Sequence, residues 1–303
     1  MSKRKRDWPE DPEPLGVPVV DNHTHLESIA GVLADGVADP GVAGHLARAA
    51  AAGVDRVVQI GCDLDAAAES VAMAARWPAV VAGVAIHPNE AVLHAGVCEV
   101  APDGLQPHPL PRHETSLDDA VAEVARLAAD PRVRTIGETG LDFFRAGERG
   151  RAVQREAFRA HIALAKELGL PMQIHDRDAH ADVLEVLERD GAPEVTVFHC
   201  FSGDEQMARY CAARGYYLSF SGTLTFSTAE DLRAAARVVP RELLLVETDA
   251  PYLTAHPWRG RPNAPYLLPL TVRALADVRG EDLDALCATL SGTAEGLYGP
   301  FAA

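Results

Sequence analysis

The sequence predicts a single (β/α)8 barrel, and three observations support this prediction. Eight short runs rich in valine, isoleucine and leucine recur along the 303 residues, and such runs are typical of parallel strands buried on both faces. Ala-rich amphipathic stretches separate the runs and are typical of crossover helices. Because no long break interrupts the alternation, a closed parallel barrel is favoured over an open sheet.

Each predicted strand is a buried run that ends in polar residues. The strands cover residues 17–25, 55–61, 80–88, 132–140, 169–176, 193–201, 215–222 and 241–253. Helices with polar starts and Gly or Pro stops are predicted over residues 44–53, 116–130, 154–169 and 180–191.

Two segments fall outside this alternation. Residues 1–15 are rich in proline and charge and are expected to be a flexible tail, so that residues 16–303 form the barrel. The basic cluster KRKR in that tail is either solvated or in contact with nucleic acid. Residues 94–115 lack periodicity and predict an extended surface loop, whose His94, His108 and His113 are either solvent-exposed or a second metal patch.

Composition limits the classes of function. Hydrophobic residues make up 48% and charged residues 24%, as in a globular protein with a large core. The net charge of -16 disfavours generic binding to nucleic acid or anionic membrane. Five scattered cysteines indicate neither disulfides nor a zinc knuckle, so we expect the protein to be located in the reducing cytoplasm. No apolar segment is long enough to span a bilayer, and no obligate protein partner is inferred.

Six metal-ligand side chains stand where predicted strands end. In parallel barrels the active site forms at the carboxyl ends of the strands. A lone histidine there is more often a hydrogen-bonded core residue, but several ligands at matching strand ends indicate a divalent-metal site. The first strand supplies two histidines whose i, i+2 spacing directs both to one side, and the full set is His23, His25, Glu138, His175, His199 and Asp249.

Six ligands are enough for two divalent cations. A carboxylate bridges the ions in two-metal sites, and Glu138 is the predicted bridge. We assign His23, His25 and Asp249 to one ion and His175 with His199 to the other. We expect the ions to acidify a water that becomes the nucleophile, which Asp249 would orient and deprotonate. The ligands suit zinc, manganese, iron or nickel, and magnesium less well.

Six motifs carry a family resemblance. In order they are DNHTHLE, AIHPNE, GETGLDFFR, QIHDRDA, FHCFSG and ETDAPYL. Together they resemble the TatD-related metal-dependent deoxyribonucleases, in the amidohydrolase-like superfamily, from about Val17 to Tyr298. The resemblance implies a metal site at the positions above and hydrolysis of DNA, with 3′ to 5′ exonuclease action on single strands. DNA is therefore the expected partner.

The resemblance also implies substrate contacts. It places His87 near the scissile phosphate, although a histidine before proline is also a turn cap. Arg145 and Arg177 resemble cleft arginines, with ion pairs as the alternative. The family loop RGKRN reads RGRPN here, from Arg259 to Asn263, and leaves Arg259 and Arg261 for phosphate. Trp258 is the aromatic residue most suited to stack on a base.

Two other functions remain open. A hydrolase of a small amide, lactone or phosphoester fits the same barrel. Barrels that cleave cyclic amides often bridge their metals with a carboxylated lysine, whereas Glu138 stands at the bridge position here. A scaffold without catalysis is disfavoured because all six ligand positions are filled.

Overall fold

The structure is a computed structural model that describes residues 7–301, and its fold class is the predicted (β/α)8 barrel. The eight strands form one sheet in which strand order follows the order along the chain, β1 to β8. At least one α-helix follows every strand.

The bounds of the elements match the predicted alternation. The strands are β1 Val19–Thr24, β2 Val54–Gly61, β3 Val80–Val84, β4 Val133–Asp142, β5 Met172–Arg177, β6 Thr196–Phe198, β7 Tyr217–Phe220 and β8 Leu244–Val246. The helices are α1 Ile29–Val32, α2 Gly41–Ala51, α3 Leu64–Arg76, α4 Pro88–His94, α5 Leu117–Leu127, α6 Glu148–Leu168, α7 His180–Asp190, α8 Glu205–Ala213, α9 Glu230–Val238, α10 Leu268–Arg279 and α11 Leu283–Tyr298. Short 3-10 turns are η1 Leu26–Ser28, η2 Pro111–Glu114, η3 Gly222–Thr225, η4 Arg241–Leu243 and η5 Pro265–Leu267.

The chain divides into two compact units. The first unit comprises the described parts of Met1–Gln59, Pro78–Val80 and Gly203–Ala303. The second unit comprises Ile60–Trp77 and Val81–Ser202.

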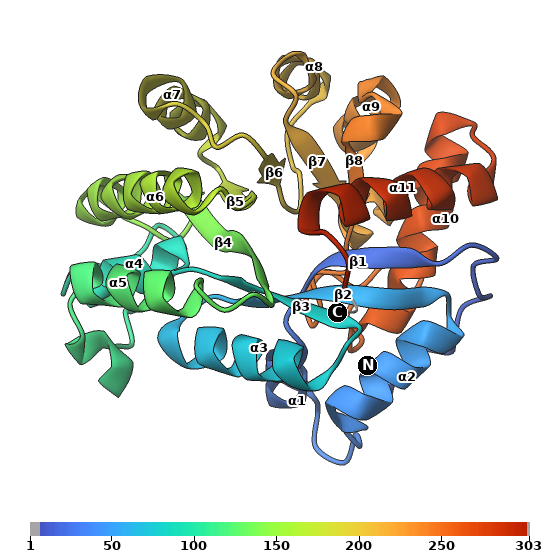
Figure 1. The fold of residues 1–303 in the computed structure, drawn as a ribbon, viewed down its shortest axis with the longest axis horizontal. Coiled ribbons are helices and arrows are strands. Elements are labelled where there is room, and N and C mark those ends of the chain that lie inside the picture. The colour runs from blue at the N-terminus through green and yellow to red at the C-terminus, as the bar shows by residue number, and fades with distance from the viewer. Residues whose placement is uncertain (1–6, 302–303) are drawn as a thin grey trace. The chain divides into compact units, whose positions relative to one another are not determined.

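In the first unit, two pairs of parallel strands carry the core. Thr24 of β1 pairs with Gln59 of β2, and Phe220 of β7 pairs with Val246 of β8. Helix α11 packs on β1 and β8, with α10 beside it (Figure 1). Phe220 is fully buried, so these contacts bury the apolar faces of strands and helices together.

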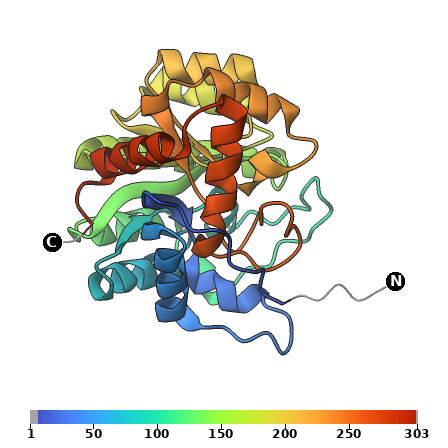
Figure 2. The same ribbon diagram turned by 90° about the vertical axis from the view of Figure 1, so that its right-hand side faces the viewer.

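The segment from Asp7 to Leu15 packs on the first unit, although we expected a flexible tail there. Trp8 Nε1 donates to the carbonyl oxygen of Ala38 at 2.9 Å, and the Tyr266 hydroxyl donates to the carbonyl oxygen of Pro9 at 2.9 Å. The segment runs beside the start of α10 (Figure 2). An aromatic side chain with a distant partner orders a stretch that composition alone marks as loose. The KRKR cluster lies outside the described residues.

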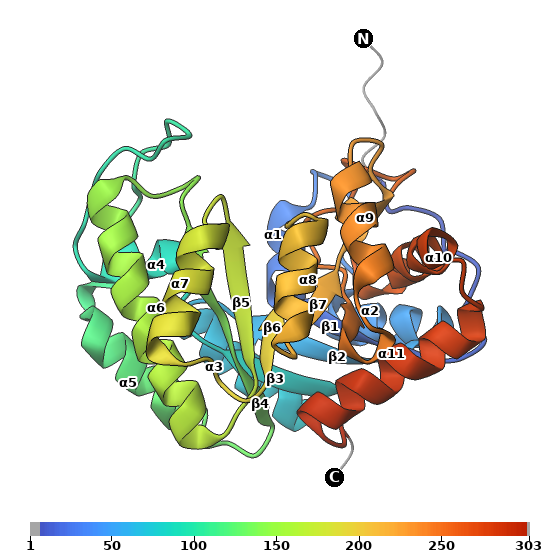
Figure 3. The ribbon, with the colours of Figure 1, turned by 90° about the horizontal axis from the view of Figure 1, so that it is seen from above.

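In the second unit, β3, β4, β5 and β6 pair in parallel. Gly140 of β4 lies opposite His175 of β5, and a Cβ at Gly140 would come within 2.1 Å of the His175 carbonyl oxygen. A side chain would therefore force the strands apart. Helices α6 and α7 pack side by side on the outer face of β4 and β5 (Figure 3).

All eight predicted strands are present, and α2, α5, α6 and α7 stand where helices were predicted. Helix α6 begins at Glu148, earlier than the predicted start at 154, because its first turn lacks the apolar spacing that predicted the rest. Residues 95–110 contain no helix or strand, as predicted. Among the described residues, no helix is long and apolar enough to cross a membrane.

Candidate functional site

Three predicted ligands meet in the first unit, and we call them the first-unit cluster: His23, His25 and Asp249. Main-chain bonds fix their positions, since Asp249 N–H donates to His23 O at 3.0 Å and His25 N–H donates to Ala250 O at 2.7 Å. His23 Nε2 and His25 Nε2 lie 3.2 Å apart, and His25 Nε2 lies 3.5 Å from Asp249 Oδ1. All three residues are buried.

The turn that carries Asp249 has an unusual backbone. Its φ is +52°, in the left-handed region that aspartate and asparagine tolerate better than most residues. Before it, Thr248 N–H donates to Asp21 Oδ1 at 2.9 Å, and Asn263 Nδ2 donates to Thr248 O at 2.9 Å. Burial raises the pKa of Asp21 to about 8 despite these bonds, with the Glu247 charge adding to the rise. The Asp21 carboxyl is therefore mainly neutral and supports the turn through its hydrogen bonds with Thr248. Glu247, which is fully buried, lies beside it.

Four residues meet in the second unit, and we call them the second-unit cluster: His87, Glu138, His175 and His199. Glu138 Oε1 lies 2.7 Å from His199 Nε2 and 3.6 Å from His87 Nε2, and it also contacts His175 Nδ1. The His175 and His199 rings are stacked with centroids 5.8 Å apart. Three imidazoles thus converge on one buried carboxylate.

The charges in the second-unit cluster reinforce one another. Burial alone would raise the pKa of Glu138, but the imidazoles of His199, His87 and His175 lower it well below its usual value. Burial opposes protonation of His175, yet Glu138 and Asp142 raise its pKa to about 9. The carboxylate is therefore ionised across the physiological range and available to a cation.

His87, the histidine of the AIHP motif, lies in this cluster. Its Nδ1 accepts a hydrogen bond from Asn89 N–H at 3.1 Å and caps α4. In the neutral ring the proton then lies on Nε2, which faces Glu138. His87 therefore both caps α4 and directs its Nε2 towards Glu138.

Two further side chains of this region escaped the sequence prediction. Cys62 follows β2 and its Sγ donates to Glu138 Oε2 at 3.3 Å. Asp142 Oδ2 lies 3.3 Å from His175 Nε2, where a carboxylate can orient a metal-ligating imidazole. Asp142 has the even spacing from Glu138 that places both on one face of β4, and that spacing was the available signal.

The arginines implied by the resemblance have different surroundings. Arg177 is exposed at the end of β5, with its guanidinium 4.0 Å from the Phe144 ring centroid. Arg145 Nε lies 3.3 Å from Asp103 Oδ2. The ion pair weighed for Arg145 is thus present, whereas Arg177 stacks on an aromatic ring and presents its charge to solvent.

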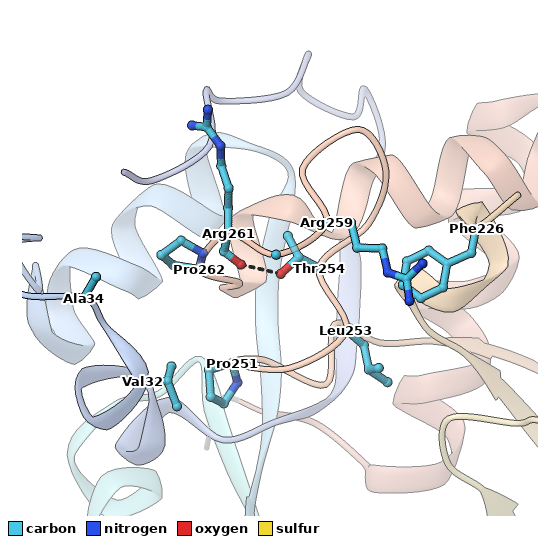
Figure 4. Close-up of a pocket in the computed structure, with 10 residues that line it drawn as sticks. Val32, Ala34, Phe226, Pro251, Leu253, Thr254, Arg259, Arg261 and Pro262 are labelled. Atoms are coloured by element: carbon cyan, nitrogen blue, oxygen red, sulfur yellow. Dashed lines mark hydrogen bonds between the residues drawn. The ribbon is translucent and has the colours of Figure 1, made fainter. Parts of the chain in front are cut away.

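The loop after β8 borders a cavity of about 470 Å³ within the first unit (Figure 4). Arg259 lines it, with the guanidinium 4.3 Å from the Phe226 ring centroid. The Arg261 guanidinium lies 4.9 Å from the Trp258 ring and donates to Asp7 O at 3.5 Å. Trp258 is half-buried beneath it. Both arginines therefore line the cavity, but their guanidinium groups stack on different rings, Arg259 on Phe226 and Arg261 on Trp258.

The donor sets in both units fit divalent metals. Each unit brings three ligand atoms within 4.8 Å of one another, from His23, His25 and Asp249 in the first and from His87, Glu138 and His175 in the second. A nitrogen separation of 3.2 Å, as between His23 and His25, is close to the roughly 3.3 Å expected for two imidazoles on one tetrahedral ion. Imidazole and carboxylate together suit zinc, manganese, iron and nickel.

A (β/α)8 barrel with histidine and carboxylate clusters at the ends of its strands has the construction of a metal-dependent hydrolase. Residues 20–299 match the family model described as TatD related DNase, and the chain belongs to that family. It is 44% identical over 286 residues to an uncharacterized metal-dependent hydrolase TatD of Mycobacterium tuberculosis, covering 93% of this chain and 98% of the relative.

Two further comparisons agree with this assignment. The chain is 36% identical over 260 residues to the 3'-5' ssDNA/RNA exonuclease TatD of Cronobacter sakazakii, covering 84% of this chain and 90% of the relative. The crystal structure of the TatD homolog YJJV of Escherichia coli aligns with a TM-score of 0.76 at 25% identity, over 92% of this chain and 97% of that one. The chain is accordingly a metal-dependent hydrolase of this family.

Proposed function

We propose that this hydrolase cleaves phosphodiester bonds in DNA, acting from the 3′ end of single strands. The observation that carries the proposal is Glu138, a buried ionised carboxylate ringed by three imidazoles where cyclic-amide hydrolases often carry a carboxylated lysine. The Cronobacter relative is named for 3'-5' exonuclease action on ssDNA and RNA, which supports the same substrate and polarity.

The chain's own residues divide the work. His23, His25 and Asp249 would hold one cation, and His175 with His199 and Glu138 the other; the sharing of Glu138 between both stays a prediction. When bound, divalent cations acidify water and neutralise charge on phosphoryl oxygens. Asp249 would orient the water and accept its proton. His87, with its proton on Nε2, would donate to a phosphate oxygen.

An exposed aromatic ring supports binding of unpaired bases. The Tyr252 side chain is 52% exposed, and its ring centroid lies 6.1 Å from that of His25 in the first-unit cluster. Its carbonyl oxygen accepts from Asn263 Nδ2 at 2.5 Å, which holds the turn. Rings of this kind stack on bases without regard to sequence.

Local charge would overcome the net charge of -16. Acidic groups beyond about 8 Å are screened at physiological salt, whereas cations among buried ligands act at contact distance. Arg177 and Arg259 add exposed guanidinium groups in the second and first unit. Phosphate contacts of this kind position the backbone and carry no sequence preference.

The test compares substrates and metals. Chelator-treated protein is incubated with 5′-labelled linear single strands, duplexes, RNA, closed circular single strands and a small phosphodiester, with zinc, manganese, magnesium, iron or nickel added back. We expect no hydrolysis without metal and, with it, a ladder of single-nucleotide steps from the 3′ end. Equal cleavage of circles would contradict exonuclease action. Cleavage of the small ester alone would favour the small-substrate alternative.

A further inference from the structure

A third group of metal-ligand side chains lies in the second unit, apart from the residues used above. Glu90 and His94 are four residues apart on α4, so both project from one face of the helix. His113 on η2 completes the group, and one ligand atom from each residue lies within 4.8 Å of the others. We call these three residues the α4–η2 cluster.

His94 offers a buried nitrogen that has no hydrogen-bond partner. Its Nδ1 lies 2.9 Å from the carbonyl oxygen of Thr115, which can only accept, so the neutral ring carries its proton on Nδ1. Nε2 is left with a lone pair, and within residues 7–301 it has no partner although the residue is only 5% exposed. An unsatisfied buried acceptor is costly, and a cation would satisfy it.

The charge around the cluster also favours a cation. Arg112 pairs with Glu90 at 2.8 Å, with Asp63 at 3.1 Å and with Asp65 at 3.6 Å. Three carboxylates therefore face one guanidinium. Arg112 and His113 both bond Glu90 through Oε2, which leaves Oε1 for another ligand.

We propose that Glu90, His94 and His113 bind a divalent transition metal, zinc foremost, in a site separate from the first-unit and second-unit clusters. Two imidazoles and one carboxylate form a set that zinc accepts, with the fourth position left to water. The sequence suggested His94, His108 and His113 as a second metal patch. In the structure His108 is exposed and lies outside the cluster, and Glu90 is the third member beside His94 and His113.

Binding requires one change of tautomer. Leu110 N–H donates to His113 Nδ1 at 2.8 Å, so without metal the proton is on Nε2, which lies 2.8 Å from Glu90. When the metal binds Nε2, that proton moves to Nδ1. The Leu110 N–H then loses its acceptor and donates a hydrogen bond to water instead. His113 stays neutral, and Leu110 is exposed enough to be hydrated.

The site would fasten the loop between α4 and η2. That loop carries Asp103, which pairs with Arg145 at 3.3 Å, and Glu99, which accepts from Gly150 N–H at 2.8 Å. A metal held at both ends of the loop reduces the freedom of the chain between them. Occupancy would then stabilise the setting of Arg145.

Zinc content per chain tests the proposal without any DNA substrate. Chelator-stripped full-length protein is titrated with zinc and measured by elemental analysis beside a Glu90→Gln/His94→Ala variant and a His108→Ala control, which alters an exposed histidine of the same loop. We expect the double variant to hold one zinc fewer than wild type and the control to match wild type. Zinc should also raise the wild-type unfolding midpoint by about 5 °C more than that of the double variant. Equal zinc content in all three proteins would overturn the proposal.

A second measurement uses only the wild type, in case the double variant does not fold. Nitrogen NMR of the imidazole rings follows the zinc titration. We expect the Nε2 signals of His94 and His113 to shift and the His113 proton to move to Nδ1. Unchanged Nε2 signals in both rings at saturating zinc would contradict the site, whatever the nuclease assays show.

Discussion

The first-unit and second-unit clusters are held together by different forces. In the first, main-chain hydrogen bonds between β1 and the turn at Asp249 position the ligands. In the second, main-chain hydrogen bonds also hold His87 and His199, but charge is added to them, because three imidazoles surround the single carboxylate of Glu138. A cluster fixed by backbone should tolerate loss of one ligand's charge, whereas a cluster balanced by charge should not.

The largest effect is expected from Glu138→Gln. The amide removes the negative charge that balances His87, His175 and His199, so we expect turnover to fall by about a thousandfold or more. The pKa of His175 should also fall, because the attraction of Glu138 raises it. Kinetics with ring NMR measure both, and Glu123→Gln, at a half-buried carboxylate of α5 that pairs with Arg126, is the control. Near wild-type turnover would remove Glu138 from the proposed centre.

The next largest effect concerns pH and the packing beneath the second-unit cluster. His161 is fully buried and accepts Ile86 N–H at 3.1 Å, and burial lowers its pKa to about 4. In the unfolded chain His161 takes up a proton near pH 6.5, whereas in the folded state it stays neutral down to about pH 4. The free energy of unfolding therefore decreases as pH falls from 6.5 towards 4, by at most about 3 kcal/mol.

Urea unfolding of metal-free wild type and His161→Gln between pH 4 and 7 measures this effect. We expect the variant to lose most of the extra slope, since glutamine does not titrate. His256→Gln, at an exposed histidine, is the matched control and should retain the wild-type slope. Parallel curves for wild type and His161→Gln would show that His161 is not held neutral.

A smaller loss is expected from Asp249→Asn in the first-unit cluster. Asparagine tolerates the positive φ at this position, and the main-chain bonds to β1 remain. The fold should therefore persist while turnover falls on the order of a hundredfold, as when a positioned base is lost. Asp249→Ala should be less stable than the asparagine variant. Full turnover in Asp249→Asn would exclude Asp249 as the base.

The smallest effect is expected from the two arginines of the loop after β8. Replacing Arg259 and Arg261 with alanine should weaken DNA binding and flatten its salt dependence by about 0.7 per lost phosphate contact on single strands. Single variants sharpen the test, since Arg261 also bonds Asp7 O. Saturated turnover should fall less than affinity. An unchanged salt slope would assign both arginines to structure.

The sequence alone predicted the barrel and most of the side chains that form the first-unit and second-unit clusters. Each strand and the ligands at its end belong to one short segment, so apolar patterning and the polar residue that follows it can be interpreted together. His23 with His25, and Glu138 with the later Asp142, also share a strand face by their even spacing. These features need no knowledge of distant partners.

Only the tertiary structure decided the contacts between distant segments. Cys62 beside Glu138, Asn263 beneath the Asp249 turn, and Trp8 on Ala38 each depend on packing between elements far apart in the chain. The burial of His94 and the pairing of Asp103 with Arg145 changed a predicted surface loop into part of a charged network. Burial and neighbouring charge set how such groups behave, and neither is encoded in a residue's local sequence.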